Sequence, residues 1–450
     1  MSVLDQIVKA YDIRGTVPDQ LNSEVAHALG VGFAKFVPSD RVVVARDMRP
    51  SGPELVDAFT SGLRSHGVGV VDIGLASTDL MYFASGTLDL PGAMFTASHN
   101  PAGYNGVKMC LAGARPVGVD TGLGEIRAMA QSVLDGIGPP ADGSSAPYEE
   151  RDLLDAFADH VLSFVDISTI GTLRVVADTA NGMGGLVVPA VIERIPGVEL
   201  ELLFGELDGT FPNHPADPLQ PANQVDLQAR VVSGGFDIGL AFDGDADRVF
   251  VVDESGEGLS GSTTTALLAS ATLRADPGAT ILHNLICSRA VPEVVHELGG
   301  TPVRTRVGHS FIKQVMAETG AVFGGEHSAH YYFARNFNAD SGLIASLMVM
   351  AEVGASGQPL SVVRKPYERY SASGEINTQV HDARAVIEQV SQAYAGHEQD
   401  RLDGLTVDCG DWWFNLRPSN TEPLLRLNLE ASDRHACDDH VAELLALITS

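Results

Sequence analysis

Three short segments of this 450-residue chain gather side chains that can carry out chemistry. The first is TASHNP at 96–101, followed by GYNGVK at 103–108, and it comes directly after the apolar run PGAMF. Ser98 supplies a hydroxyl nucleophile, His99 stands beside it, and Lys108 adds a cation. A turn at the end of a strand places such a hydroxyl at the carboxyl edge of a sheet, where α/β folds bind ligands. The same residues are also compatible with a capped loop, since Ser and Asn cap helices.

The second segment is DGDADR at 243–248, which follows the apolar run FDIGLAF. Asp243, Asp245 and Asp247 crowd three like charges into one loop, and such charges need an opposite charge nearby. A hard divalent cation with oxygen ligands supplies it, and Mg²⁺ is usual at phosphoryl-transfer sites. The spacing resembles the start of a calcium loop, but no Gly follows the third Asp. A solvated acidic turn is the alternative to the metal site that we expect.

The third segment is RPSNTEP at 417–423, in a turn between two predicted strands. An arginine can bind two phosphate oxygens at once, while hydroxyls and backbone N–H groups bind the others. The segment therefore suits a phosphate group, although by itself it is equally typical of a polar hairpin turn.

A weaker signal lies in GGEHSAHYYF at 324–333, where Glu326, Ser328 and His330 alternate. In an extended chain these three side chains share one face, which suits sugar hydroxyls or proton transfer. A zinc site from Glu326, His327 and His330 is the competing interpretation, but its spacing fits no common zinc pattern.

Basic residues gather near the same motifs. RVGHS at 306–310 precedes a predicted helix that contains Lys313, and a helix N-terminus can hold an anion. YDIRG at 11–15 and ARDMRPSG at 45–52 place arginines close to strand ends. A lone arginine is usually a surface residue, but this chain has only 29 basic residues, so their gathering favours an anionic ligand.

Strand-like and helix-like runs alternate over about the first 370 residues. The alternation predicts βαβ units and mostly parallel sheets. Strands are expected at 41–47, 67–74, 173–182, 236–242, 279–285 and 301–307, and helices at 53–67, 184–194 and 291–300. These fall into three α/β blocks of similar size.

The last eighty or so residues follow another pattern. Consecutive short strands joined by turns indicate an antiparallel α+β domain. Its strands are expected at 375–380, 404–409, 411–418 and 423–431, and its helices at 383–396 and 440–450. The predicted domains are 1–147, 148–254, 255–369 and 370–450, and the Gly/Pro/Ser-rich stretch at 135–147 is the clearest linker.

Composition excludes several classes of function. With 58 acidic and 29 basic residues the formal net charge is −29, which opposes a general nucleic-acid binder and docking on an anionic membrane. The N-terminus lacks a signal-peptide pattern, and the apolar run at 341–354 is short enough to be a core helix. Four scattered cysteines (Cys110, Cys287, Cys409 and Cys437) are expected to be reduced. We expect a cytoplasmic protein.

TASHNP, DGDADR, GEHSAH and RPSNTEP, in this order, resemble motifs of the α-D-phosphohexomutase superfamily, and within it those of the bacterial phosphomannomutase/phosphoglucomutase group. The resemblance runs from YDIRG near the start through all four predicted domains. It implies four domains around a central cleft, and an enzyme that interconverts hexose 1-phosphate and hexose 6-phosphate. The implied reaction runs through a phosphoserine and a hexose 1,6-bisphosphate, which is intermediate and activator, and needs Mg²⁺. Small phosphosugars are the implied partners of a monomer or homodimer.

The resemblance also implies roles for individual residues. Ser98 would carry the phosphoryl group, and a phosphoryl oxygen on it would join Asp243, Asp245 and Asp247 around Mg²⁺. His330 is the candidate general base, with further catalytic roles for Arg14, His99 and Lys108. The implied substrate-binding residues are Tyr11, Arg248, Arg289, Gly308, His309, Glu326, Ser328, Arg417, Ser419, Asn420, Thr421 and Arg426.

Two positions depart from the family pattern, and alternatives stay open. Ile286 stands where some relatives have a lysine, and Ala329 where Gly is common. A phosphoglucosamine mutase is the alternative within the superfamily, although that group typically has Gln at the position of His327. A Mg²⁺-dependent sugar phosphatase and a non-catalytic sugar-phosphate sensor are alternatives from other classes. The sequence does not distinguish mannose from glucose.

Overall fold

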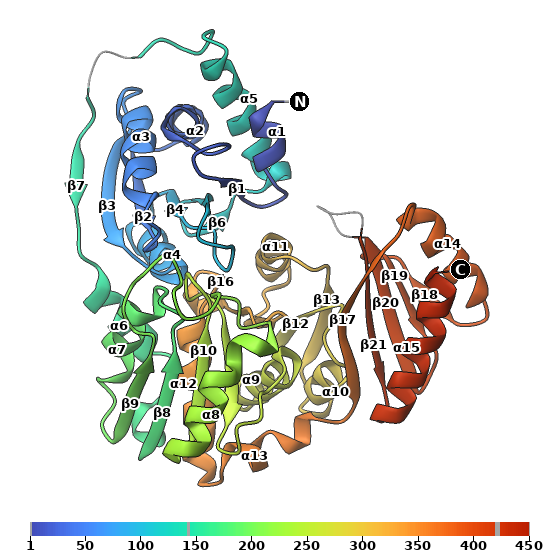
Figure 1. Cartoon of the computed structure of the whole chain (residues 1–450). Coiled ribbons are helices and arrows are strands. Elements are labelled where there is room, and N and C mark those ends of the chain that lie inside the picture. The colour runs from blue at the N-terminus through green and yellow to red at the C-terminus, as the bar shows by residue number, and fades with distance from the viewer. Residues whose placement is uncertain (1, 142–144, 419–423, 450) are drawn as a thin grey trace. The chain divides into compact units, whose positions relative to one another are not determined.

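The computed structural model describes residues 2–141, 145–418 and 424–449, and their side chains except those of residues 120, 309 and 310 (Figure 1). Its contacts divide the chain into two compact units. One unit comprises Met1–Leu259 with Ser328–Val363, and the other comprises Ser260–His327 with Arg364–Ser450.

The first unit opens with a mixed sheet built around buried β-branched runs such as Val42–Val44. The strand order is β1-β5-β4-β2-β3-β7, and β6 pairs with β5. β2 runs parallel to β3 and β4, whereas β5 runs antiparallel to β1 and β4. The strands are β1 (Ile13–Thr16), β2 (Arg41–Arg46), β3 (Gly69–Leu75), β4 (Gly92–Phe95), β5 (Tyr104–Leu111), β6 (Arg115–Pro116) and β7 (Tyr148–Glu150).

Helices accompany this sheet and supply much of its core. Phe33 of α2 and Phe59 of α3 belong to the same buried cluster as Val42, Val44 and Phe95 of the strands. The helices are α1 (Val3–Ile7), α2 (Ser23–Phe36), α3 (Gly52–Arg64), α4 (Thr78–Leu88) and α5 (Leu123–Leu134). The last strand, β7, lies beyond residue 147 yet pairs with β3, because the chain returns to the sheet edge after the linker.

A second sheet of the first unit has the order β11-β10-β8-β9. Every residue of β10 is buried, as expected for a strand covered on both faces. Its elements are α6 (Leu154–Leu162), β8 (Leu173–Asp178), α7 (Gly184–Ile192), β9 (Val198–Leu203), α8 (Val225–Gly234), β10 (Ile238–Phe242) and β11 (Val249–Asp253). The unit also contains β15 (Tyr331–Phe333), β16 (Ala339–Asp340), α12 (Gly342–Ser356) and α13 (Leu360–Val363).

The apolar helix α12 packs on β10 and β11 and confirms the core helix expected at 341–354. Within the described ranges, no single helix is long and apolar enough to cross a membrane; only α12 taken with residues 360–367, a pair bent by 94°, passes by length and composition.

The second unit combines a parallel group of strands with an antiparallel sheet. β12 (Thr280–Asn284) runs parallel to β13 (Thr301–Thr305) and β14 (Phe323–Gly325), with α9 (Gly261–Ala275), α10 (Ala290–Glu297) and α11 (His309–Thr319) beside them. The antiparallel sheet has the order β17-β21-β20-β19-β18. It consists of β17 (Ser371–Gln379), β18 (Glu398–Asp400), β19 (Leu405–Asp408), β20 (Trp412–Pro418) and β21 (Leu424–Ala431), with α14 (Ala383–Ala393) and α15 (Arg434–Thr449).

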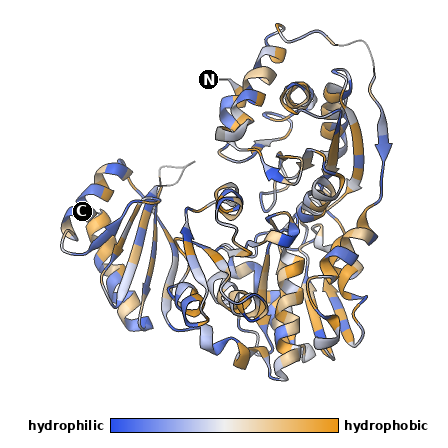
Figure 2. Cartoon of the chain, turned by 180° about the vertical axis from the view of Figure 1, so that it is seen from behind, coloured by the Kyte–Doolittle hydropathy of each residue, from blue (hydrophilic) through white to orange (hydrophobic). Residues whose placement is uncertain are grey.

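These elements confirm the expected fold class: mixed, mainly parallel α/β sheets followed by an antiparallel α+β domain. Figure 2 shows hydrophobic and hydrophilic residues mixed along both helices and strands. None of the four cysteines forms a disulfide bond. The placement of the domains around a central cleft stays a prediction.

One local expectation is wrong. Residues 326–330 were expected to be extended, but they form a turn between β14 and β15. Ala329 has φ +64°, and a left-handed residue breaks the alternation of side chains along a strand. Glu326, Ser328 and His330 therefore do not share a face in the way that their spacing predicts.

Candidate active site

Ser98 lies in the tight loop that follows β4. Its φ is +50°, a left-handed conformation that few non-glycine residues adopt and that is often found at functional sites. Its backbone N–H donates to Thr96 Oγ1 at 2.9 Å, and its side chain is almost fully buried. The hydroxyl donates to Asp243 Oδ2 at 2.8 Å, so the nucleophile candidate meets the acidic loop.

The acidic loop is the connection between the antiparallel strands β10 and β11. Asp243, Asp245 and Asp247 are buried, and one carboxylate oxygen from each lies within 4.8 Å of the others. Asp245 Oδ1 and Asp247 Oδ1 make no hydrogen bond to any described residue. Buried oxygens without donors are costly, and hard divalent cations use such oxygens as ligands. The donor set therefore fits a metal ion.

Lys108 comes from β5 and joins two of these carboxylates. Its Nζ donates to Asp245 Oδ2 at 2.7 Å and to Asp247 Oδ2 at 2.6 Å. Burial alone would lower the pKa of Lys108, but Asp245 and Asp247 outweigh it and raise the pKa well above its ordinary value. Lys108 therefore stays a cation and can compensate charge, but it cannot act as a base near neutral pH.

Arg248 connects the acidic loop to His99. Its Nε donates to Asp243 Oδ2 at 3.0 Å, and its Nη2 lies 2.7 Å from His99 Nδ1. Burial and the cations Arg248 and Arg14 lower the pKa of His99 well below its ordinary range, so the ring is neutral and accepts at Nδ1. Burial raises the pKa of Asp243 to about 7, against the effect of Arg248.

His330 approaches the same cluster from the turn before β15. Its Nδ1 lies 2.8 Å from Asp340 Oδ2 and 3.9 Å from Asp247 Oδ1. Burial alone would lower the pKa of His330, but Asp247 and Asp340 raise it above its ordinary value. Asp247, His330 and Asp340 form a second group of possible metal ligands, which shares Asp247 with the first.

Further polar residues surround the loop of Ser98. Arg14 of β1 donates from Nη1 to Asn100 Oδ1 at 2.7 Å and from Nε to Asp12 Oδ2 at 2.8 Å. Thr78, at the start of α4, donates to Asp245 Oδ2 at 2.6 Å. Tyr11 precedes β1 and is half-buried.

In the second unit, Glu326 and Gly308 come together at the carboxyl ends of β12, β13 and β14. Glu326 Oε2 accepts from Asn284 Nδ2 at 3.1 Å and from the Gly308 N–H at 3.4 Å. Arg289 is held elsewhere in this unit: its guanidinium donates to the Gly410 carbonyl and to Asp408 Oδ1, both at 2.6 Å.

Arg417 and Arg426 lie opposite each other on the neighbouring strands β20 and β21. Both pair with Glu375 of β17, at 2.6 Å from Arg417 and 3.3 Å from Arg426. The Nε atoms of both arginines are buried and have no hydrogen-bond partner among the described residues. The two arginines thus form a cationic pair that one carboxylate partly neutralises.

Comparison with known proteins identifies the chain. Four family models match it in order: phosphoglucomutase/phosphomannomutase alpha/beta/alpha domains I, II and III at residues 5–133, 155–256 and 260–370, and the C-terminal domain at 375–447. The chain belongs to the phosphoglucomutase/phosphomannomutase family. A protein of this family is an enzyme that acts as a phosphotransferase and isomerase in carbohydrate metabolism.

Individual members of the family match over nearly the whole chain. A protein named "Phosphohexose mutases" from Xanthomonas campestris pv. campestris is 42% identical and a phosphomannomutase from Escherichia coli K12 is 39% identical, each over 94% of both chains. A crystal structure of a phosphoglucomutase/phosphomannomutase family protein from Burkholderia thailandensis has a TM-score of 0.89 at 31% identity, over 100% of this chain and 98% of the other.

Several predicted residues of this mutase come together in the first unit. Ser98, Lys108, Arg248 and His330 lie beside the three aspartates. His99 contacts Arg248, and Arg14 contacts Asn100 in the loop that carries Ser98. In the second unit, Glu326 contacts Gly308. Ser328 is half-buried in the turn before β15, and His309 is the first residue of α11. Ser419, Asn420 and Thr421, and the side chain of His309, lie outside the described residues.

The zinc alternative receives no support. Among the described residues, the groups of possible metal ligands are the two that share Asp247, and neither contains Glu326 or His327. His327 Nδ1 instead lies 3.0 Å from Ser262 Oγ.

Some site residues were missed from the sequence. Thr78 and Asp340 stand far from the motifs and carry no local pattern of their own. Arg49 lies within ARDMRPSG, one of the arginine-bearing segments beside a strand end, and its contacts with the Ser98 loop are described below.

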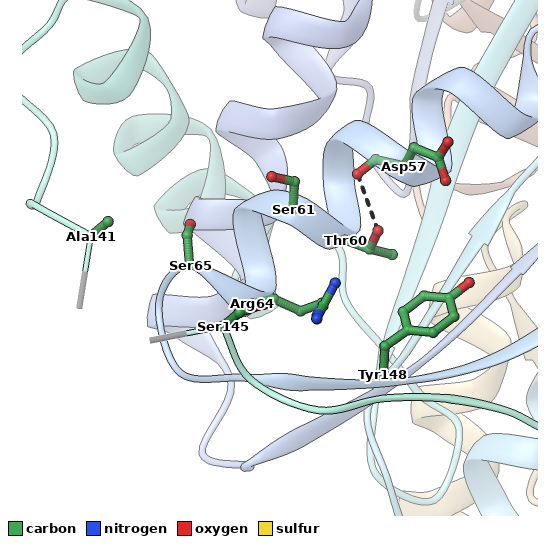
Figure 3. Close-up of a pocket in the computed structure, with 8 residues that line it drawn as sticks. All are labelled: Asp57, Thr60, Ser61, Arg64, Ser65, Ala141, Ser145 and Tyr148. Atoms are coloured by element: carbon green, nitrogen blue, oxygen red, sulfur yellow. Dashed lines mark hydrogen bonds between the residues drawn. The ribbon is translucent and has the colours of Figure 1, made fainter. Parts of the chain in front are cut away.

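Two pockets are lined by residues other than those of the Ser98 cluster. One, of about 650 Å³, opens between α3 and the chain around β7 and is lined by Asp57, Thr60, Ser61, Arg64, Ser65, Ala141, Ser145 and Tyr148 (Figure 3). The guanidinium of Arg64 lies 5.6 Å from the centre of the Tyr148 ring. The other, of about 210 Å³, lies in the second unit beside Arg289 and Arg304.

Proposed function

We propose that this enzyme interconverts hexose 1-phosphate and hexose 6-phosphate, with mannose and glucose as the sugars, through a phosphoserine at Ser98 and a hexose 1,6-bisphosphate. The observation that carries the proposal is the contact between Ser98 Oγ and Asp243 Oδ2 at 2.8 Å, inside a cluster of three buried aspartates. The names of the relatives, phosphomannomutase and phosphohexose mutase, support the substrate class.

Asp243, Asp245 and Asp247 are the proposed ligands of Mg²⁺, together with a phosphoryl oxygen on Ser98. When bound, Mg²⁺ neutralises charge on the transferring group, which is the main requirement of phosphoryl transfer. The two aspartate oxygens without donors support this assignment.

The chain's own cations share that task. Lys108 and Arg248 are buried beside the aspartates and can turn toward the added phosphoryl oxygens on Ser98. His99, neutral and bound to Arg248, orients that arginine. Arg14 fixes Asn100 in the loop that carries Ser98.

His330 is the proposed general base. Asp340 holds its Nδ1, so Nε2 is the nitrogen that would exchange a proton with the sugar hydroxyl. A neighbouring carboxylate sets the tautomer of an imidazole in this way. Because the reaction is reversible, the same nitrogen accepts the proton in one direction and returns it in the other.

The remaining predicted residues are proposed to bind the substrate. Arg417, Ser419, Asn420, Thr421 and Arg426 would hold the phosphate group that is not reacting, with Gly308 and His309 nearby. Glu326, Ser328 and Tyr11 would bind sugar hydroxyls. Arg289 fits this role less well, because the C-terminal sheet engages its guanidinium. The four proposed domains, 1–147, 148–254, 255–369 and 370–450, would each contribute one of the four motifs.

The cationic pair favours a mutase over a phosphatase. Arg417 and Arg426 would bind a second phosphate group, which a hydrolase does not need. His327, where phosphoglucosamine mutases typically have Gln, disfavours glucosamine phosphate. A cytoplasmic monomer or homodimer that uses the bisphosphate as activator completes the proposal.

³¹P NMR of the purified enzyme with Mg²⁺ and a trace of glucose 1,6-bisphosphate tests the proposal. Mannose 1-phosphate, glucose 1-phosphate and glucosamine 1-phosphate are supplied in turn. We expect 6-phosphate signals from the first two. These signals should be lost in Ser98→Ala and kept in Ser346→Ala, which removes a buried hydroxyl that donates to the Gly342 carbonyl of its own helix. Release of free phosphate alone would establish a phosphatase, and no change with any sugar would exclude both activities.

A further inference from the structure

Arg49 is a fully buried arginine in the turn after β2, and every N–H of its guanidinium has an acceptor. Nε donates to Asp47 Oδ2 at 3.2 Å. Nη1 donates to the carbonyls of Pro101 and Tyr104, both at 2.9 Å. Nη2 donates to the carbonyls of Ser98 at 2.9 Å and Asn100 at 2.7 Å. An arginine side chain has five N–H donors, and all five are used here.

The four carbonyls belong to one segment, residues 98–104, which connects β4 to β5 and carries the proposed nucleophile. A buried carbonyl needs a donor, and in this segment a single side chain supplies four of them. Asp47 provides the opposite charge, and the ring of Phe211 lies 5.2 Å from the guanidinium carbon. The position of the guanidinium and the shape of the segment are therefore fixed together.

The carbonyl of Ser98 is held from two sides. Arg49 Nη2 binds it on one side. On the other side Gly244 of the acidic loop approaches so closely that a Cβ there would lie 2.5 Å from the Ser98 oxygen. A carbonyl held in this way fixes the left-handed backbone of Ser98, and that backbone directs Oγ toward Asp243.

We infer that Arg49 is a positioning residue for phosphoryl transfer: it holds the 98–104 segment in the conformation that presents Ser98 to the metal loop. The inference rests on the proposed function, in which Ser98 carries the phosphoryl group. Lysine keeps the charge but offers three donors without the planar fork, so it cannot hold all four carbonyls and Asp47 together.

Arg49→Lys tests the inference, with Arg174→Lys as its matched control. Arg174 also binds two backbone carbonyls, those of Gly234 and Gly235, and a carboxylate, Glu199, but it lies on β8 away from Ser98. Because a misplaced reacting group costs about 100-fold in rate, we expect Arg49→Lys to lower kcat by about that factor. KM should change little, since the sugar-binding residues are untouched. The control variant Arg174→Lys should have the same kcat and KM as the wild-type enzyme.

Amide hydrogen exchange separates positioning from a general loss of stability. In folded Arg49→Lys, the amides of residues 98–104 should exchange faster, while those of β8 and β10 keep wild-type rates. Wild-type kcat together with unchanged exchange in the segment would overturn the inference. The exchange measurement does not depend on turnover, so an inactive wild-type enzyme would refute the proposed function and leave this test intact.

A second measurement uses the wild-type enzyme and covers the case in which Arg49→Lys does not fold. The enzyme is labelled with ¹⁵N-arginine, and its NMR spectrum is recorded. Because all five N–H groups of the Arg49 guanidinium are buried and hydrogen-bonded, we expect its Nη signals to be resolved and to exchange slowly with water. These signals should shift when glucose 1,6-bisphosphate phosphorylates Ser98. A single averaged Nη signal, insensitive to phosphorylation, would overturn the inference.

Discussion

Lys108 and Asp245 lie 137 positions apart in the sequence, and their side chains meet in a buried ion pair of 2.7 Å. The lysine comes from a strand of the first sheet and the aspartate from a loop of the second. A buried charge is tolerated when it is paired, so each of these residues depends on the other. The pair therefore ties the proposed phosphoserine domain to the proposed metal domain.

Removing this lysine is expected to make the enzyme depend on metal for its stability. Lys108→Met leaves buried carboxylates without their cation, which typically costs about 3–5 kcal/mol. Thermal unfolding should show a large loss without Mg²⁺, and Mg²⁺ should recover more stability in the variant than in the wild type. Lys35→Met, at an exposed position at the end of α2, is the control. Equal stability of Lys108→Met and wild type in EDTA would contradict this expectation.

A methyl group at residue 244 is expected to displace the nucleophile loop. In Gly244→Ala the new Cβ would lie 2.5 Å from the Ser98 carbonyl oxygen. Overpacking of this kind costs about 1–3 kcal/mol, and displacement of Ser98 should lower kcat by about 100-fold. Unfolding and steady-state kinetics measure the two effects. Gly103→Ala is the matched control, because a Cβ there meets nothing within 4 Å; similar behaviour of the two variants would argue against a close approach at Gly244.

Neutralising Glu375 is expected to strengthen anion binding. The carboxylate pairs with both Arg417 and Arg426, so it would compete with the phosphate group that these arginines are proposed to bind. Glu375→Gln should bind inorganic phosphate about tenfold more tightly, a difference of about 1.4 kcal/mol, in a calorimetric titration. Glu388→Gln, which breaks an exposed pair with Arg401, should leave the affinity unchanged. Weaker or equal binding by Glu375→Gln would show that the arginines need this carboxylate to stay in place.

The pair of His214 and Asp178 is expected to make stability depend on pH. His214 Nε2 lies 3.0 Å from Asp178 Oδ2, and this hydrogen bond raises the pKa of His214 above its ordinary value. A histidine with a raised folded-state pKa stabilises the fold fully below its unfolded pKa of about 6.5, and this contribution is lost as the pH rises through the folded value.

Denaturant unfolding of wild type and His214→Gln at several pH values measures that contribution. The stability difference between the two proteins should be largest at mildly acidic pH and shrink as the solution becomes alkaline. A difference that is constant across this range would mean that the proton on His214 contributes nothing to folding.

The sequence predicts much of the fold because its signals are local. The β-branched run at 41–47 and the antiparallel strands at 411–418 and 423–431 are formed nearly where their patterns place them. The turn at 326–330 was missed because alternating polar residues are also typical of a strand, and only the left-handed Ala329 distinguishes the two. The strand β7 was missed because its partner β3 lies more than seventy residues earlier.

The sequence predicts those parts of the candidate site in which several reactive residue types stand close together in one short segment. Ser98 and the three aspartates stand out by residue type and spacing. Thr78, Asp340 and Arg49 do not, because each acts through a partner that only the folded chain brings near. The hydrogen bond from Thr78 to Asp245 spans 167 positions, and the contacts of Arg49 with residues 98–104 join two strand ends about fifty positions apart.

The contact between Ser98 and Asp243 also determines when, during synthesis of the chain, the candidate site can form. The two residues are 145 positions apart, and domains generally fold in turn as the chain leaves the ribosome. A nascent chain that ends before residue 243 already holds its serine, but neither the acidic loop nor the glycine that packs against the serine carbonyl has been made. Under the proposed mechanism, a half-made chain would therefore be unable to take a phosphoryl group from a sugar phosphate until translation has passed residues 243–247.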